Sequence, residues 1–266
     1  MIKDFKFKDN YNVYDLVDII KILRGEGGCP WDMVQTHESI RKDFIEETYE
    51  VIEAINKNNP DMLREELGDV LMQVVFHAQI ETEKGVFDID DVADEICKKM
   101  IVRHPHVFGD VNADTVDDVL TNWDIIKRST KGQKSTSEAI DSIPRELPAL
   151  MRAAKVQHKA AKAGFDWTEV SGALDRLSDE INELKEAIEK GEQAQISEEL
   201  GDVLFSAVNV SRFVDVEAEE ALTVSTDKFV SRFKKVEKMA DERGINMKEA
   251  DLAVLDELWD EAKKSK

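Results

Sequence analysis

Apolar residues recur every three or four positions along most of the chain, which is the period of an amphipathic helix. Two such apolar stripes, one in each half, consist of Leu63, Leu67, Val70, Leu71 and Val74 and of Leu200, Val203, Leu204, Ala207 and Val208. No segment shows the strict alternation of a half-buried strand. The pattern predicts an all-α fold of helical bundles. Coiled coils are the alternative, but no heptad pattern persists over several turns.

One polar stretch, "KRSTKGQKSTSEAIDSIPREL" from Lys127 to Leu147, interrupts this periodicity. Gly, Ser, Thr and Lys dominate its first part, which is typical of a connection between domains. We therefore expect an N-terminal helical domain over residues 1–128, a linker over 129–142 and a C-terminal helical domain over 143–266.

The heptapeptide "EELGDVL" occurs at Glu65 to Leu71 and again at Glu198 to Leu204, so the offset (198 − 65 = 133) is half of the 266 residues. The same offset relates two sets of acids: Glu47, Glu50, Glu66 and Asp69 in the first half, and Glu180, Glu183, Glu199 and Asp202 in the second. Each half thus has Glu-x-x-Glu on one helix and Glu-x-x-Asp on the next. Because residues three apart share a helix face, two antiparallel helices can aim four carboxylates at one point.

Four converging carboxylates repel one another unless a cation lies among them. Oxygen donors without His or Cys suit Mg²⁺, with Mn²⁺ as a possible substitute, better than Zn²⁺. A di-iron bundle would use Glu-x-x-His instead. The competing interpretation is a solvated acidic face, which is common in a chain with 57 acidic residues. Against it, Gly68 and Gly201 recur inside helices at a cost of about 1 kcal/mol each, which predicts close approach of a neighbouring helix or a ligand.

The composition of the chain limits the kinds of binding partner and the cellular location that we expect for the protein. The 36 basic and 57 acidic residues give a net charge of −21, which disfavours nucleic acids and anionic membranes as partners. Cys29 and Cys97 are too few and too far apart for a disulfide framework. The N-terminus has no apolar signal core, and no run is long enough to span a membrane. We expect a cytoplasmic protein.

A lysine, an arginine and a tryptophan of the second half suit a phosphate and a base. Lys228 and Arg232 lie one helical turn apart and can hold an anionic group, and Trp259 offers a stacking surface. The similar residues of the first half are Lys99, Arg103 and Trp123. A second pair of tryptophans lies in "GCPWD" (Trp31) and "GFDWT" (Trp167). Surface cations and core tryptophans are the ordinary alternative for each residue alone.

Several segments together resemble the two-domain bacterial MazG family of nucleoside triphosphate pyrophosphohydrolases. They are "GGCPWDMVQTHESI", "EETYEVIEAI", "REELGDVLMQVVFHAQ", "RHPHVF", "IPRELPALMRAAKVQ", "GFDW" and the second "EELGDVLF", and the resemblance runs from about Val13 to Lys263. It implies two all-α bundle domains and a homodimer whose two protomers complete each bundle. It also implies Mg²⁺-dependent cleavage of a nucleoside triphosphate to the monophosphate and pyrophosphate.

The resemblance assigns roles in the second half, where such enzymes generally have their productive site. The metal-binding positions are Glu180, Glu183, Glu199 and Asp202, and the nucleotide-binding positions are Arg176, Lys228, Arg232 and Trp259. Two departures are Asp179 for the family's first glutamate and Arg176 for its usual lysine. Glu180 is our candidate for the general base. We expect broad base specificity and a task in nucleotide-pool house-cleaning or control of signalling nucleotides.

The two halves differ at positions beside the acids. Asn209, on the acid-bearing face of the second half, corresponds to Phe76, and Arg176 corresponds to Asp43. The first site therefore lacks a hydrogen-bonding side chain and a cation, and we expect it to contribute less activity. The alternative to an enzyme is an acidic helical scaffold or regulator that binds partner proteins and uses the metal only for structure.

Overall fold

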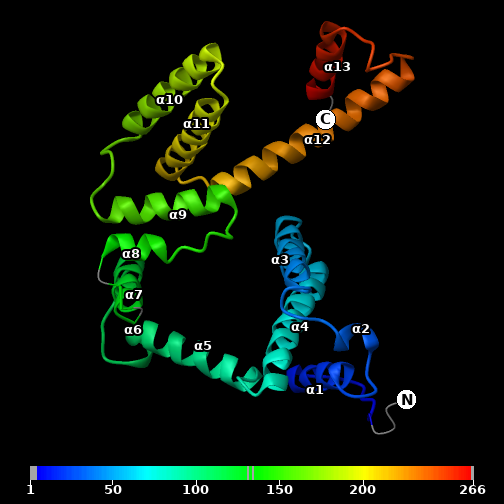
Figure 1. Cartoon of the computed structure of the whole chain (residues 1–266), viewed down its shortest axis with the longest axis vertical. Helices are drawn as coiled ribbons and strands as arrows, with labels where there is room; N and C mark the ends of the chain where they lie inside the picture. Colours follow the sequence, from blue (N-terminus) through cyan, green and yellow to red (C-terminus); the bar gives the residue numbers. More distant parts are fainter. Residues whose placement is uncertain (1–4, 131, 134, 265–266) are drawn as a thin grey trace. The chain divides into compact units, whose positions relative to one another are not determined.

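The computed structural model describes residues 5–130, 132–133 and 135–264, and these residues form helices and connecting loops with no strand. The chain divides into two compact units, Met1–Lys127 and Arg128–Lys266. The prediction of an all-α fold is confirmed (Figure 1). Among the described residues, no helix is both long enough and apolar enough to cross a membrane.

The first unit is built around a helical hairpin. Its helices are α1 (Val13–Arg24), α2 (Pro30–Met33), α3 (Arg41–Asn56), α4 (Pro60–Lys84), α5 (Ile89–Arg103), α6 (Pro105–Phe108) and α7 (Val116–Thr130), whose last turn enters the second unit. The turn between α3 and α4 is short because Asn58 adopts a left-handed conformation and Asn59 caps α4 by accepting a hydrogen bond from Met62 N at 3.2 Å. This turn makes α3 and α4 antiparallel neighbours.

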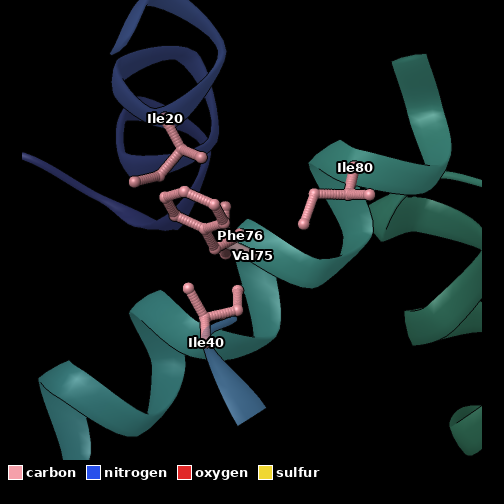
Figure 2. Close-up of a cluster of buried hydrophobic side chains, with 5 residues drawn as sticks. All are labelled: Ile20, Ile40, Val75, Phe76 and Ile80. Atoms are coloured by element: carbon pink, nitrogen blue, oxygen red, sulfur yellow. The ribbon is translucent and has the colours of Figure 1, made fainter. Parts of the chain in front are cut away.

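The core of the first unit lies where α1 packs on the C-terminal part of α4. Figure 2 shows Ile20 of α1 and Ile40, just before α3, on either side of Phe76, with Val75 and Ile80 beside them on α4. All five side chains are buried. The acid-bearing turns of α4 lie before this core, so the core anchors one end of the helix that carries Glu66 and Asp69.

The second unit contains a second hairpin of the same kind. Its helices are α8 (Thr136–Asp141), α9 (Ala149–Lys162), α10 (Val170–Lys190), α11 (Gln193–Phe213), α12 (Ala218–Glu242) and α13 (Leu252–Lys264). Gly191, with φ of 74°, ends α10 in the left-handed conformation and allows the sharp turn into α11. The range 129–142 contains α8, whose buried Ala139 belongs to this unit.

Further packing contacts join the other helices of the second unit. α9 packs on α11, and Gln157 of α9, which is buried, donates a hydrogen bond to the carbonyl of Phe205 at 2.8 Å. α12 and α13 pack on each other through Val236, Ala240, Leu258 and Ala262. Three of the four residues expected to bind the nucleotide lie on this helix pair, Lys228 and Arg232 on α12 and Trp259 on α13, whereas Arg176 lies on α10.

Candidate functional site

The hairpin of α10 and α11 brings acidic side chains from two helices together. Glu180 of α10 and Glu199 and Asp202 of α11 each present a carboxylate oxygen, and these oxygens lie within 4.8 Å of one another. Glu180 is buried, Glu199 is half-buried and Asp202 is exposed, so the group opens from the interior towards solvent. Three carboxylates at this spacing could hold one metal ion.

Glu180 is the most unusual member of the group. Only 4% of the residue is exposed, and its Oε2 is buried with no hydrogen-bond partner among the described residues. Burial raises the pKa of Glu180, with Glu183, Asp202 and Glu199 adding to the increase and Arg176 opposing it. A buried carboxylate oxygen without a partner is costly in a folded protein unless a ligand satisfies it.

Glu183 does not join the three clustered acids. Its side chain is half-exposed, and its Oε1 lies 3.4 Å from Nη1 of Arg176. Arg176 also contacts Glu180, with 2.7 Å between Nη2 and Oε1. Among the described residues of the second unit, three of the four predicted carboxylates thus come together, and the fourth, Glu183, lies beside Arg176.

The first unit repeats the arrangement with a different balance of charge. Oxygens of Glu47, Glu66 and Asp69 lie within 4.8 Å of one another, and all three residues are half-buried. Desolvation raises the pKa of both glutamates, and so does Glu50, which forms hydrogen bonds with each. At the position of Arg176 this unit has Asp43, so this position supplies a negative charge in place of a cation.

The other expected nucleotide-binding residues lie on α12 and α13. The guanidinium carbon of Arg232 lies 5.9 Å from the ring centroid of Trp259, and Phe229 packs on the same ring at 5.1 Å. The first unit has the same pair, because Arg103 lies 5.8 Å from the ring of Trp123. Lys228 precedes Arg232 by one turn of α12. Figure 1 shows that α12 begins close to the end of α11, and α12 packs on α13.

The glycines of the repeated heptapeptide are more open than the sequence predicts. Apart from the chain neighbours and the backbone of the same helix turns, no described atom comes within 4 Å of a Cβ placed on Gly68 or Gly201. Our expectation that a neighbouring helix approaches these glycines is therefore wrong within the chain. Close approach of another molecule to these glycines stays a prediction.

Sequence reasoning also missed an arginine network in each unit. Arg212 joins Asp166 in the second unit, and Arg24 joins Glu83 in the first. The partners are 46 and 59 residues apart, so local spacing gave no signal. The two arginines do not correspond in the repeat either, because Arg24 belongs to α1 and Arg212 to α11.

Comparison with known proteins identifies the repeated domain. The sequence model of the MazG nucleotide pyrophosphohydrolase domain matches twice, over residues 35–108 and 168–237. Each matched range includes one set of four acids. Together the two ranges cover more than half of the chain.

Several curated proteins are similar over nearly the whole chain. The nucleoside triphosphate pyrophosphohydrolase/pyrophosphatase MazG of Thermotoga maritima is 47% identical over 249 residues, covering 94% of each protein. The nucleoside triphosphate pyrophosphohydrolase of Escherichia coli K12 is 44% identical over 252 residues, covering 94% of this chain and 96% of that protein. YabN of Bacillus subtilis is 49% identical over 250 residues, which are 93% of this chain but half of that protein. This chain belongs to the MazG family of nucleotide pyrophosphohydrolases.

Proposed function

We propose that this protein is a Mg²⁺-dependent nucleoside triphosphate pyrophosphohydrolase, which converts a nucleoside triphosphate and water to the monophosphate and diphosphate. The observation that carries the proposal is the buried, unpartnered Oε2 of Glu180 within a group of three carboxylates. The names of the Thermotoga and Escherichia relatives support the same reaction.

The residues of the second unit fit a divalent cation. Glu180, Glu199 and Asp202 would hold it, since they supply only oxygen donors and their mutual repulsion favours a positive charge among them. When bound, such an ion supplies neutralisation of the phosphate charge and a lower pKa for a water molecule. Mg²⁺ is the proposed ion and Mn²⁺ a substitute, because both prefer oxygen ligands.

The remaining residues would bind the substrate and move a proton. Lys228 and Arg232 would hold the triphosphate, with the base against Trp259. Water would attack the α-phosphorus, and the bond from that phosphorus to the bridging oxygen of pyrophosphate would break. Glu183 is better placed than Glu180 to take the water's proton, because it lies outside the group of three and is half-exposed.

A second copy of the chain would complete the site. The acid-bearing hairpin exposes an apolar stripe formed by Leu174, Ile181 and Ile188 on α10 and by Leu200 and Leu204 on α11. A row of exposed apolar residues on one surface suits contact with another molecule. A homodimer that buries the stripe would also bring cations and aromatic residues of α12 and α13 to the acids.

The first unit would be a second MazG-like domain with a weaker site. Glu47, Glu50, Glu66 and Asp69 would bind metal, but Asp43 and Phe76 stand where the second unit has a cation and an amide beside its acids.

Stacking of the base on an aromatic ring favours broad base specificity. Broad specificity suits house-cleaning of the nucleotide pool or control of signalling nucleotides. The free thiols of Cys29 and Cys97 fit a reducing cytoplasm.

The decisive experiment replaces the acids of α11. Glu199→Gln and Asp202→Asn should each lower pyrophosphate release from ATP, GTP, CTP and UTP by at least about 100-fold at saturating Mg²⁺, as loss of a charge-stabilising group does. Glu186→Gln, an exposed acid on α10, is the matched control and should keep wild-type turnover. Near wild-type turnover in both site variants would remove this site from the reaction. A melting shift with nucleotide and Mg²⁺ but no turnover would favour the scaffold alternative.

A further inference from the structure

The loop between α9 and α10 is tied to α11 by Arg212, a partly buried arginine. Nη1 and Nη2 of Arg212 donate to the two carboxylate oxygens of Asp166 at 2.8 and 2.5 Å. Both side chains are mostly buried, and the arginine holds the pKa of Asp166 below its usual range. A paired, bidentate contact of this kind fixes geometry better than an exposed ion pair does.

The same arginine determines how Asn209 is oriented. Nε and Nη2 of Arg212 donate to Oδ1 of Asn209 at 3.1 and 2.8 Å. Because a guanidinium carries only donors, the amide must turn its oxygen towards Arg212. The Nδ2 group, with two hydrogens to donate, is then the part of Asn209 that can meet a ligand.

Asn209 lies on the acid-bearing face of α11. Glu199, Asp202, Ser206 and Asn209 follow one another at three- and four-residue spacing, and the last two are buried polar residues. Seven residues separate Asp202 from Asn209, which is about 10 Å along a helix. A triphosphate bound at the acids with its nucleoside end directed along α11 would reach Asn209.

A second contact fixes the same loop. The ring of Trp167 lies against Gly172 at the start of α10, where a Cβ would come within 2.3 Å of Cδ1 of the indole. Only glycine fits at this position without moving the tryptophan. The loop is thus held through Asp166 on one side and Trp167 on the other, with Trp167 still 43% exposed.

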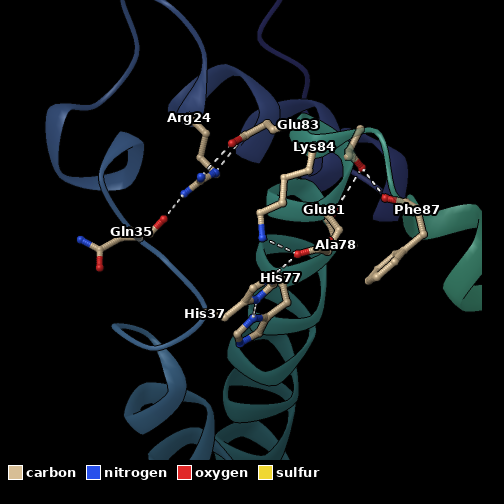
Figure 3. A network of polar contacts seen from close by, with 10 residues as sticks. Arg24, Gln35, His37, His77, Ala78, Glu81, Glu83, Lys84 and Phe87 are labelled. Atoms are coloured by element: carbon tan, nitrogen blue, oxygen red, sulfur yellow. Dashed lines mark hydrogen bonds and ion pairs between the residues drawn. The ribbon is translucent and has the colours of Figure 1, made fainter.

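The first unit fixes its corresponding loop without providing an amide. Nε and Nη2 of Arg24 donate to the carboxylate of Glu83, both at 2.8 Å, and Nη1 donates to the carbonyl of Gln35 at 3.1 Å (Figure 3). The guanidinium lies 4.9 Å from the ring of Phe76, the residue that corresponds to Asn209. In both units an arginine contacts this aligned residue, which is Phe76 in the first unit and Asn209 in the second. Of these two side chains, only that of Asn209 can donate a hydrogen bond.

We propose that Asn209 donates a hydrogen bond to an acceptor on the nucleoside end of the substrate, and that Arg212 with Asp166 is the positioning pair that holds Asn209 and the 164–167 loop for this contact. The inference rests on the proposed function, because it takes the triphosphate to lie at the acids of α10 and α11. It separates recognition of the nucleoside from recognition of the phosphates.

Calorimetry on the full chain with Mg²⁺ tests this with two ligands. One is α,β-methylene ATP, which resists cleavage between the α and β phosphorus atoms, and the other is inorganic tripolyphosphate, which lacks the nucleoside. Asn209→Ala should raise the Kd for the nucleotide about tenfold and leave the Kd for tripolyphosphate unchanged. Arg212→Lys should raise the nucleotide Kd about threefold or more, again with no effect on tripolyphosphate. In turnover assays the same variants should raise KM and change kcat little.

Arg24→Lys is the matched control, since it weakens the equivalent carboxylate pair of the first unit and should lower the melting temperature without changing either Kd. An unchanged nucleotide Kd in Asn209→Ala would overturn the inference. An equal rise in the Kd for the nucleotide and for tripolyphosphate would overturn it too. Binding does not depend on turnover, so a wild-type protein that cleaves no triphosphate would refute the proposed function alone. Loss of turnover in Glu199→Gln beside an unaffected Asn209→Ala would refute only this inference.

Discussion

Replacing Glu180 by glutamine should stabilise the metal-free protein, although changes at buried residues usually destabilise. The carboxylate of Glu180 lies within 4.8 Å of those of Glu199 and Asp202. Two unit charges at that distance repel by about 3.5 kcal/mol at an effective dielectric constant of 20 and by about 1 kcal/mol in water. Arg176, at 2.7 Å, offsets much of this repulsion. We expect Glu180→Gln to raise the free energy of unfolding by about 1 kcal/mol near neutral pH.

The pH dependence follows from the raised pKa of Glu180, whose first cause is burial. A raised pKa means that the folded state holds the proton more tightly than the unfolded state. The stability from this group is therefore complete below the unfolded pKa of about 4.5 and is lost as pH rises through the folded value. The glutamine variant has no such proton, so its advantage should be absent at low pH and appear across that window.

Thermal unfolding by circular dichroism, with EDTA, measures the effect. A change of about 1 kcal/mol corresponds to about 2–4 °C in a chain of this size. Glu186→Gln, on the same helix but exposed, should change the melting temperature by less. Mg²⁺ at 100 times its Kd should add about 2.7 kcal/mol to the wild type and less to Glu180→Gln. If Glu180→Gln melted below wild type in EDTA at pH 7.5 and gained equally from Mg²⁺, the electrostatic reasoning would be refuted.

Three further variants test the other parts of the site. Arg232→Lys keeps the charge but loses the planar group beside Trp259, so it should raise KM for ATP by about tenfold in pyrophosphate-release assays, whereas an unchanged KM would contradict the assignment. Ile181→Lys places a charge in the exposed apolar stripe and should yield monomers by light scattering, with activity lost; an intact dimer would argue against this interface. Glu66→Gln should reduce turnover far less than Glu199→Gln, and equal losses would show that both units are active.

The helices were predictable because their apolar period extends over many turns, but what covers each apolar face was not. Leu67 and Leu200 belong to the stripes read from the sequence, yet both are about half-exposed in the chain. Periodicity identifies a face that avoids water; it does not distinguish a neighbouring helix from a second molecule. The Asn58 and Gly191 turns, by contrast, follow from local chemistry and could be located by sequence alone.

The helix turns that carry the acids could be predicted from the sequence, but the direction of each side chain could not. Residues three apart differ by about 60° around a helix, so Glu180 can point inward while Glu183 points to the side. Arg176 contacts both glutamates, at 2.7 Å for Glu180 and 3.4 Å for Glu183. Arg212 was beyond sequence reasoning, because its partner Asp166 lies on another element and the first unit fills the equivalent role from α1.

The repeated glycine gives the sharpest test of what lies beyond the single chain. Gly201 is exposed and has open space around it, so alanine there should gain about 1 kcal/mol of helix stability if nothing else approaches. The chain nevertheless has glycine at both positions, Gly68 and Gly201, and so loses this helix stability in each half. We infer that another molecule, either the second protomer or the nucleotide, comes close to this turn in the working enzyme.

Gly201→Ala should therefore weaken self-association or raise KM for ATP by several-fold, even though the isolated helix favours alanine. Sedimentation over a dilution series measures the first effect, and pyrophosphate release measures the second. Gly244→Ala is a poor control because Gly244 has φ of 65°, which strains any alanine. Ser178→Ala, on the exposed surface of α10, is better matched. A Gly201→Ala protein that melts higher, associates as wild type and keeps its KM would show that the glycine is only inherited with the repeat.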